Sequence, residues 1–287
     1  MKPPAFGSDR RLEGCPAPGK LNLFLHVTGR CSDGYHLLQS VFRLLDWGDT
    51  LDFSVRDDGI IRRVSAVGNV PEETDLCVRA ARALQQAARC PLGADIALHK
   101  RLPMGGGLGG GSSDAATTLM ALNHLWDTRL GLDRLREIGV GLGADVPFFL
   151  FGRDAFAEGI GEILQPVDVP PACYVVLSPG ISVPTARIFS SPDLTRNTPQ
   201  IKVADFTFCH SKNDLQPVAC KLFPEIMEAL LWLGQFAPAR MTGSGACIFA
   251  SVGSAELAAG IVRQCPAPWR AWQAPSLARH PMLALVA

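Results

Sequence analysis

Six of the seven positions from Gly105 to Gly111 are glycine, and the chemistry that this pattern favours is phosphate binding. Glycine has no side chain, so its backbone can approach a ligand closely. Ser112, Ser113 and Asp114 follow as helix-starting residues, and apolar residues then recur at helical spacing. A glycine loop that enters a helix presents free N–H groups and the positive end of the helix dipole to an anion. A flexible Gly/Ser linker is the alternative, but a linker would not lie between a strand-like segment and an apolar helix.

Two common phosphate-binding patterns almost fit this chain, and each fails on what accompanies it. Gly14 to Lys20 matches G-x-x-x-x-G-K, but Leu21 stands where a Mg²⁺-binding Ser or Thr is required, and a strand-like segment follows instead of a helix. The glycines at 105, 107 and 110 match the dinucleotide pattern G-x-G-x-x-G, but a lone match is weak. The acidic residue that should follow is present only loosely, as Asp127. The sequence therefore predicts a phosphate loop of another design.

Several polar residues could act near such a loop, although each also has an ordinary structural interpretation. Lys20 precedes a strand-like segment and could be a solvated charge, and Asp145 lies in a Gly-Ala-Asp-Val-Pro break where aspartate commonly closes a turn. Tyr35 and His36 follow a turn and could form a surface or core pair. Lys100 could approach a nucleotide or remain solvated. Residue types alone leave these alternatives open, and they assign no role to His26, His99 and His124.

The composition narrows the class of protein. The 287 residues are 47% hydrophobic and 19% charged with zero net charge, so a large core can form, and nucleic-acid binding through bulk positive charge is disfavoured. Nine cysteines are scattered without a C-x-x-C pair, which favours a reducing compartment over a disulfide framework or zinc site. No signal peptide and no run of 18 apolar residues occurs, so we expect a cytoplasmic protein without a membrane span.

Strands and helices alternate through both halves of the chain, which predicts an α+β or α/β protein. We expect a loose tail over residues 1–14, a hairpin turn at 57–59 and a short buried strand over 148–151, and His26 should point outward from its strand. The prolines from Pro166 to Pro171 indicate a boundary between a domain over 1–165 and a second over 166–287. Further predicted strands are 21–27, 49–55, 94–98, 173–177, 247–252 and 269–274, and residues 155–158 and 162–164 should flank a turn at Gly159 and Gly161. Predicted helices are 75–88, the segment after the glycine loop, 132–142, 185–189, 214–233 and 254–264.

Several stretches of the chain together resemble the GHMP kinase superfamily, which is named for galactokinase, homoserine kinase, mevalonate kinase and phosphomevalonate kinase. Pro103-x-x-x-Gly-Leu-Gly-x-x-Ser-Ser113 is similar to its ATP loop. Pro18 to Leu25 looks like its first motif, and Thr242 to Cys247 looks like its third. The resemblance is narrowed to one branch of the superfamily by Asp33-Gly-Tyr-His36, Lys100 to Ser113 and Leu142-Gly-Ala-Asp-Val-Pro147.

The resemblance implies a GHMP kinase two-domain fold of the α+β class. The N-terminal domain would be ribosomal-S5-domain-2-like, the C-terminal domain ferredoxin-like, and the active site would lie in the cleft between them. The branch uses ATP and Mg²⁺ to phosphorylate the 2-hydroxyl of 4-diphosphocytidyl-2-C-methyl-D-erythritol (CDP-methylerythritol) in the non-mevalonate route to isoprenoids. The partners would be these small molecules, without nucleic acid or membrane, and the chain would be a monomer or homodimer.

Two rival functions remain to be weighed against this one. A kinase of another small alcohol, such as mevalonate or homoserine, is disfavoured by the Asp33-Gly-Tyr-His36 stretch. A catalytically dead member that only binds ligands is disfavoured because Lys20 and Asp145 are both present.

The resemblance also implies residue roles. Asp145 would take the proton from the substrate hydroxyl, and Lys20 would keep Asp145 ionised and stabilise charge on the transferred group. Tyr35 and Phe189 would sandwich the cytosine and His36 would pair with its edge, while Asn22 and Thr185 would contact the same substrate. The ATP-binding residues would be Leu76, Lys100, Pro103, Gly105, Gly106, Gly107, Leu108, Gly109, Gly110, Gly111, Ser112 and Ser113. No metal ligand is fixed, although the Ser113 hydroxyl could reach Mg²⁺.

Three residues depart from the usual pattern of this branch. Gly19 stands where alanine is usual, and Asp114 and Asp75 stand where asparagine is common. The first two leave the chemistry intact, whereas Asp75 could alter a contact near the adenine.

Overall fold

The computed structural model describes residues 1, 4–8, 10–32, 34–66, 68, 70–207 and 212–286. Its strands are β1 (Ala5–Ser8), β2 (Arg11–Arg30), β3 (His36–Arg56), β4 (Ile61–Arg63), β5 (Gly93–His99), β6 (Ala155–Glu158), β7 (Ile163–Pro166), β8 (Cys173–Ser178), β9 (Ala239–Met241), β10 (Ile248–Val252) and β11 (Arg270–Pro275). Its α-helices are α1 (Leu76–Ala88), α2 (Gly110–Leu125), α3 (Leu132–Val140), α4 (Val146–Phe151), α5 (Thr185–Phe189), α6 (Gln216–Leu222), α7 (Pro224–Gly234) and α8 (Ala255–Arg263). Short 3₁₀ turns lie at η1 (Glu72–Thr74), η2 (Val203–Asp205) and η3 (Pro281–Leu285).

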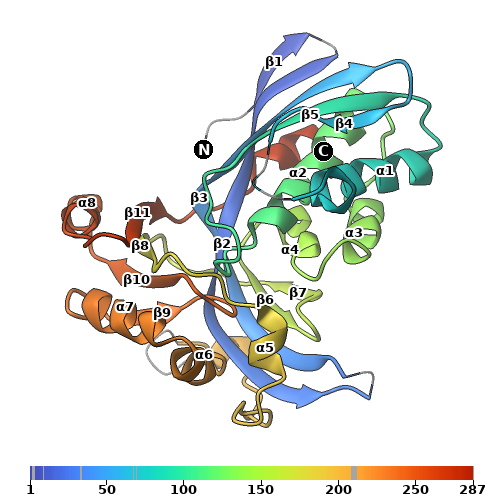
Figure 1. The fold of residues 1–287 in the computed structure, drawn as a ribbon. Helices are drawn as coiled ribbons and strands as arrows, with labels where there is room; N and C mark the ends of the chain where they lie inside the picture. The colour runs from blue at the N-terminus through green and yellow to red at the C-terminus, as the bar shows by residue number, and fades with distance from the viewer. Residues whose placement is uncertain are drawn as a thin grey trace.

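The first sheet is built on the long antiparallel pair of β2 and β3, which runs the length of the molecule in Figure 1. The strand order is β1-β2-β3-β5-β4. Strand β6 pairs with residues 40–42, near the start of β3, and β7 pairs with β6. The register of β2 on β3 shifts between Pro18 and Lys20 and again between Asn22 and Leu25. These bulges bend the pair and redirect its side chains at the position of the functional residues.

Four helices, α1 to α4, lie together beside this sheet in Figure 1. Their apolar residues join those of the sheet in one core, in which Leu119 and Leu122 of α2 meet Leu51 and Phe53 of β3. Helix α2 is buried on nearly every side, because all its residues from Ser113 to Asn123 are buried. The glycine loop thus leads into the most enclosed helix of the molecule.

The second sheet has the order β11-β8-β10-β9, and each neighbouring pair is antiparallel. In chain order its principal elements are β8, α7, β9, β10, α8 and β11, which is the ferredoxin-like βαββαβ arrangement. The α+β class and the ferredoxin-like second sheet are both confirmed. The boundary after residue 165 stays a prediction, and it falls between the last two residues of β7.

Alternate residues of the second sheet face two different cores. Val175 and Leu177 of β8 pack with the helices α6, α7 and α8, whereas Tyr174 and Val176 face the first sheet. The second contact includes Leu108 of the glycine loop. The loop is therefore held between the two sheets.

Four local predictions are wrong. Residues 148–151 belong to α4, with Pro147 at its start and Gly152 in the left-handed conformation at its end, because a short buried apolar run can form either a strand or a helix turn. Part of the expected tail, residues 5–8, forms β1, which pairs with β2. The turn at 57–59 does not close a hairpin, since β4 pairs in parallel with β5. His26 is buried rather than outward, with 6% of its surface exposed.

Two further findings concern the chain as a whole. Among the described residues, none of the helices combines the length and apolar character needed to cross a membrane. Eight cysteines are described and all are free thiols, while Cys209 lies outside the described residues.

Candidate active site

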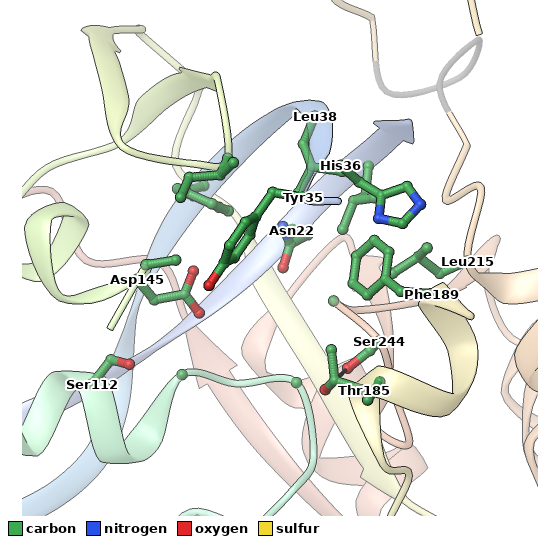
Figure 2. A pocket seen from close by; sticks show the side chains of 18 of the residues that line it. Asn22, Tyr35, His36, Leu38, Ser112, Asp145, Thr185, Phe189, Leu215 and Ser244 are labelled. Atoms are coloured by element: carbon green, nitrogen blue, oxygen red, sulfur yellow. Dashed lines mark hydrogen bonds between the residues drawn. The ribbon is translucent and has the colours of Figure 1, made fainter. Parts of the chain in front are cut away.

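Two adjoining cavities meet at the glycine loop. The larger, of about 840 Å³, is drawn in Figure 2, and the smaller, of about 400 Å³, lies on the other side of the loop. Residues of the predicted site that line the larger cavity are Lys20, Asn22, Tyr35, His36, Gly105, Gly107, Gly109, Ser112, Asp145, Thr185 and Phe189. Those that line the smaller cavity are Leu76, Lys100, Pro103, Gly105 to Gly111 and Ser112. Segments far apart in the sequence thus converge on one loop.

The conformation of the loop requires glycine at several positions. Gly107 has a φ of +76°, and a Cβ there would lie 2.3 Å from the carbonyl oxygen of Thr242. A Cβ on Gly106 would lie 2.6 Å from the Cys247 sulfur. Both contacts are with the second glycine motif, so the expected approach of this motif to the loop is present. The glycine-rich character therefore serves close packing as well as ligand access.

The loop is anchored by its carbonyl groups, which leaves its amides available. The Leu108 carbonyl accepts from the Lys20 amide at 2.9 Å, and the Gly106 carbonyl accepts from the Cys247 amide at 3.2 Å. Within the described part of the chain, the N–H groups from Gly105 to Gly109 have no hydrogen-bond partner. Helix α2 then begins at Gly110 without a side-chain cap. Free donors at a helix N-terminus are the arrangement that suits an anion.

Helix α2 begins two residues earlier than the serines suggest, and this changes how Ser112 and Ser113 are used. Both serines lie within its first turn, and only Ser112 lines the two cavities. The Ser113 hydroxyl is fully buried, has no hydrogen-bond partner among the described residues and reaches neither cavity. The predicted contact of Ser113 with Mg²⁺ is therefore not supported by the geometry.

Lys20 and Asp145 face each other across the larger cavity. The Lys20 ammonium nitrogen lies 3.4 Å from the Asp145 carboxylate, and the lysine side chain is 5% exposed whereas the aspartate side chain is 32% exposed. The ammonium also donates to the Asn22 side-chain oxygen at 2.6 Å and lies 4.8 Å from the centre of the Phe42 ring. The Asn22 amide nitrogen in turn donates to Ser40. A buried cation thus approaches a carboxylate that stays open to the cavity.

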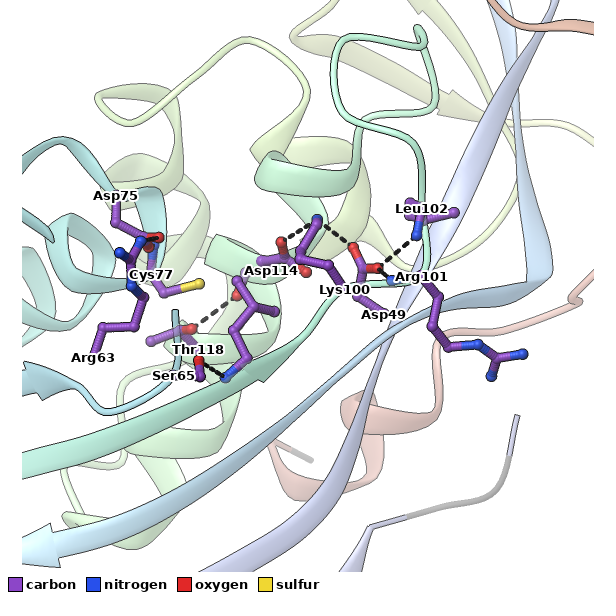
Figure 3. Close-up of polar contacts among 11 residues, drawn as sticks. Asp49, Arg63, Ser65, Asp75, Cys77, Lys100, Arg101, Leu102, Asp114 and Thr118 are labelled. Atoms are coloured by element: carbon purple, nitrogen blue, oxygen red, sulfur yellow. Dashed lines mark hydrogen bonds and ion pairs between the residues drawn. The ribbon is translucent and has the colours of Figure 1, made fainter. Parts of the chain in front are cut away.

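Lys100 is not a free lysine beside the loop. Its ammonium contacts the buried carboxylates of Asp49 and Asp114, the latter at 2.9 Å (Figure 3). Asp49 also accepts from the backbone amides of Arg101 and Leu102, and so fixes the entry to the loop.

Burial lowers the pKa of Lys100, but its two carboxylate partners outweigh burial and raise it above the ordinary value. Burial raises the pKa of Asp114 to about 8, despite the opposing effect of Lys100.

Asp75, one of the unusual residues, has a structural role at the start of α1. Its carboxylate accepts from the Cys77 amide at 2.8 Å and pairs with Arg63 at 2.6 Å. Leu76 follows it and lines the smaller cavity. An aspartate at this position caps the helix and fixes the neighbouring strand β4, while Leu76 supplies apolar surface to the cavity.

The far end of the larger cavity is built from aromatic side chains. In Figure 2 Tyr35 lies on one side and His36 and Phe189 lie on the other. The rings of His36 and Phe189 are in contact, with centroids 4.9 Å apart and a tilt of 34°. Thr185 begins α5 and its hydroxyl lies 2.8 Å from that of Ser244. Asp33, from the motif that includes Tyr35 and His36, lies outside the described residues.

Three contributors to the site were missed by the sequence analysis. Asp49 binds the backbone at the start of the loop, and Arg196 contacts His36. The Thr242 hydroxyl accepts a hydrogen bond from the backbone N–H of Asn22 at 2.9 Å. Thr242 belongs to the second glycine motif, but Asp49 and Arg196 carry no local signal, because Lys100 and His36, the site residues that they contact, are distant from them in the sequence.

Comparison with known proteins gives a consistent result. The model of the GHMP kinase N-terminal domain matches residues 75–153, and that of the GHMP kinase C-terminal domain matches residues 197–271. A protein of Azoarcus sp. (strain BH72) named 4-diphosphocytidyl-2-C-methyl-D-erythritol kinase is 66% identical over 96% of this chain and 98% of its own length. A protein of the same name from Herminiimonas arsenicoxydans is 58% identical over 95% of this chain and 98% of its own length.

Solved structures agree with the sequence comparisons. A crystal structure of 4-(cytidine 5'-diphospho)-2C-methyl-D-erythritol kinase superposes with a TM-score of 0.79 at 33% identity, covering 93% of this chain and 98% of that one. A Methanococcus jannaschii mevalonate kinase gives a TM-score of 0.68 at 14% identity, covering 95% of this chain and all of its own. The second likeness concerns the fold alone.

Proposed function

Because the chain belongs to the GHMP kinases and, within them, to the family of 4-diphosphocytidyl-2-C-methyl-D-erythritol kinases, we propose that it transfers the γ-phosphate of ATP to the 2-hydroxyl of CDP-methylerythritol. The observation that carries this proposal is the arrangement of one loop with a cavity on each side. The smaller cavity is lined by loop amides and Leu76, as a nucleotide requires. The larger cavity joins the Lys20–Asp145 pair to an aromatic end, as an acceptor with a base requires.

At the loop, the chain binds the phosphates of ATP through its backbone. The free amides from Gly105 to Gly109 and the first turn of α2 neutralise negative charge without needing to reorganise, because the loop carbonyls are already held. Phosphoryl transfer depends mainly on such positioning and charge neutralisation. The role of Lys100 is indirect, since it pairs with Asp49 and Asp114 and so stabilises the conformation of the loop.

Between the cavities, Asp145 accepts the proton of the acceptor hydroxyl and Lys20 stabilises both this carboxylate and the developing charge on the transferred group. The 3.4 Å separation of their charged atoms, with the aspartate open to the cavity, suits these roles. Asn22 holds the lysine in place, because its oxygen accepts from the ammonium and its amide nitrogen is fixed by Ser40. The acceptor hydroxyl would then lie close to Asp145 as the bond forms.

The residues beside the loop fit a magnesium ion. Mg²⁺ takes oxygen ligands and is usually held by substrate phosphates, water and one or two protein groups. The Ser112 hydroxyl and the Asp145 carboxylate both line the cavity next to the phosphate-binding amides and supply such oxygens. When bound, the ion neutralises charge on the phosphates of ATP.

At the far end, Tyr35 and Phe189 bind the cytosine between their rings and His36 pairs with its edge. Their positions on two sides of one cavity support this assignment (Figure 2). Stacking supplies apolar contact area and orients the base. Thr185 and Ser244 lie at the same end and offer hydroxyl groups to the substrate.

An assay of ADP release tests the reaction. The purified protein is supplied with ATP, Mg²⁺ and either CDP-methylerythritol, mevalonate or homoserine at equal concentrations. We expect turnover with CDP-methylerythritol and none above background with the other two alcohols. Turnover that prefers mevalonate or homoserine would overturn the substrate assignment. Tight ATP binding without turnover of any alcohol would favour a ligand-binding protein.

A further inference from the structure

Arg196 joins the two residues at the aromatic end of the larger cavity. Its Nε donates to Nε2 of His36 at 3.0 Å, although 160 positions separate the two residues. Its Nη2 donates to the carbonyl groups of Phe189 at 2.9 Å and Ser191 at 2.8 Å, and its Nη1 donates to that of Leu194 at 3.1 Å. One half-buried guanidinium thus ties the start of β3 to the end of α5.

The contact with Arg196 determines which nitrogen of His36 carries the proton. A guanidinium has only donors and keeps its charge, so the atom that receives its hydrogen bond must have a free lone pair. His36 Nε2 is therefore unprotonated, and the hydrogen of the neutral ring is on Nδ1. Burial, together with the positive charges of Arg196 and Arg30, lowers the pKa of His36, so the ring stays neutral near pH 7.

A His36 ring with this tautomer offers a donor to the cavity. His36 lines the cavity beside Phe189, and within the described part of the chain Nδ1 has no hydrogen-bond partner. N3 of cytosine is an acceptor, whereas N3 of uracil carries a hydrogen and is a donor. A fixed N–H group at this position therefore pairs with cytosine and leaves two donors facing each other with uracil.

We propose that Arg196 is a positioning residue that fixes the Nδ1–H tautomer of His36 and so makes the acceptor site select cytidine over uridine. This inference rests on the proposed function for the identity of the acceptor. It adds Arg196 as the residue that makes His36 a hydrogen-bond donor to the base. Arg196 acts through its bond to His36 and does not contact the substrate. The three bonds to carbonyl groups at and after the end of α5 make Arg196 a rigid support.

The tautomer can be observed directly by ¹⁵N NMR of the histidine ring nitrogens in the full-length protein. We expect His36 of the wild type to show a protonated Nδ1 and an unprotonated Nε2 at pH 7.5. In Arg196→Gln the ring should move to a mixture of tautomers. The matched control is Arg187→Gln, because Arg187 lies on α5, the helix whose end Arg196 contacts, but is exposed, and its guanidinium lies 5.2 Å from the centre of the Phe223 ring.

Selectivity is measured by calorimetric binding of CDP and UDP while a non-hydrolysable ATP analogue saturates the nucleotide site. We expect the wild type and Arg187→Gln to bind CDP about ten- to a hundredfold more tightly than UDP. Arg196→Gln should bind the two nucleotides within about threefold of each other. In turnover, it should raise KM for CDP-methylerythritol and leave KM for ATP unchanged. Arg196→Lys should restore part of the preference, since its ammonium can still donate to Nε2.

The outcomes separate this inference from the proposed function. A wild-type spectrum with the hydrogen on Nε2 overturns the role of Arg196, even if Arg196→Gln does not fold. An unchanged CDP preference in a folded Arg196→Gln also overturns it. A wild type that does not phosphorylate CDP-methylerythritol overturns the proposed function, while the tautomer and the CDP preference still decide the role of Arg196.

Discussion

The glycine loop and the aromatic end of the larger cavity are built in different ways. The loop end presents backbone amides from one continuous segment, Gly105 to Gly111, and these are fixed by bonds to the loop carbonyl groups. The aromatic end presents side chains from β3 and α5, which meet only through contacts such as His36 on Phe189. Backbone binds phosphate without regard to what is attached to it, whereas oriented rings and donors can read a particular base. The comparison contrasts the proposed ATP site, which is built from backbone, with the proposed acceptor site, which is built from side chains that can select a base.

The Lys20–Asp145 pair should give the largest effect, because it is proposed to act on the reacting groups themselves. We expect Asp145→Asn and Lys20→Met each to lower kcat by about a thousandfold or more, since a base or a transition-state charge is lost. Nucleotide binding, measured by calorimetry, should stay within a few-fold of the wild type. Asp193→Asn serves as the control, because Asp193 pairs with Lys221 on the surface. Near-normal turnover of Asp145→Asn would remove the base from the mechanism.

A glycine substitution in the loop should act mainly on the binding of ATP. Gly107→Ala places a Cβ 2.3 Å from the Thr242 carbonyl and forces alanine into a left-handed conformation. We expect KM for ATP to rise about tenfold to a hundredfold and thermal stability to fall, because the loop must shift. Gly131→Ala is the matched control, since its Cβ would meet nothing within 4 Å and its φ is −68°. Equal effects of the two substitutions would contradict the backbone argument.

A substitution at the aromatic end should produce the opposite kinetic pattern. Phe189→Ala removes one ring from the cavity, and we expect KM for CDP-methylerythritol to rise about tenfold to a hundredfold while KM for ATP stays unchanged. Steady-state kinetics with each substrate varied in turn measures both constants. Phe236→Ala is a suitable control because Phe236 is partly exposed and packs on Trp232 instead. A rise in both constants would show that the two ends are not separable.

The last expected effect is on stability rather than turnover, and it concerns the support of the loop and its dependence on pH. Burial raises the pKa of Asp114 from 3.8 to about 8, so the folded protein retains a proton that the unfolded chain releases. This contribution to stability is full below about pH 4 and is lost as pH rises to about 8. Asp114→Asn cannot titrate and should make the free energy of unfolding less dependent on pH over this range. Urea unfolding at several pH values measures the slope, and parallel slopes for the two proteins would exclude the effect.

The sequence predicted some elements better than others, for identifiable reasons. Helix α1 was placed correctly because Asp75 caps it and its apolar residues recur along one face. Helix α4 was mistaken for a strand because four buried apolar residues in a row have no period to read. The burial of the Asp49 and Asp114 side chains could not be predicted, since burial of a carboxylate depends on the whole surrounding core.

The sequence by itself determined the glycine loop and the family, because both depend on residues that are adjacent in the chain and on their permitted backbone conformations. Only the tertiary structure decided which side chains reach the cavities and which of them contact one another. It separated Ser112, which reaches the cavities, from Ser113, which does not, and it paired Lys20 with Asp145. It also brought Arg196 to His36. Such contacts arise from bulges, sheet packing and burial across the whole chain, and no local pattern records them.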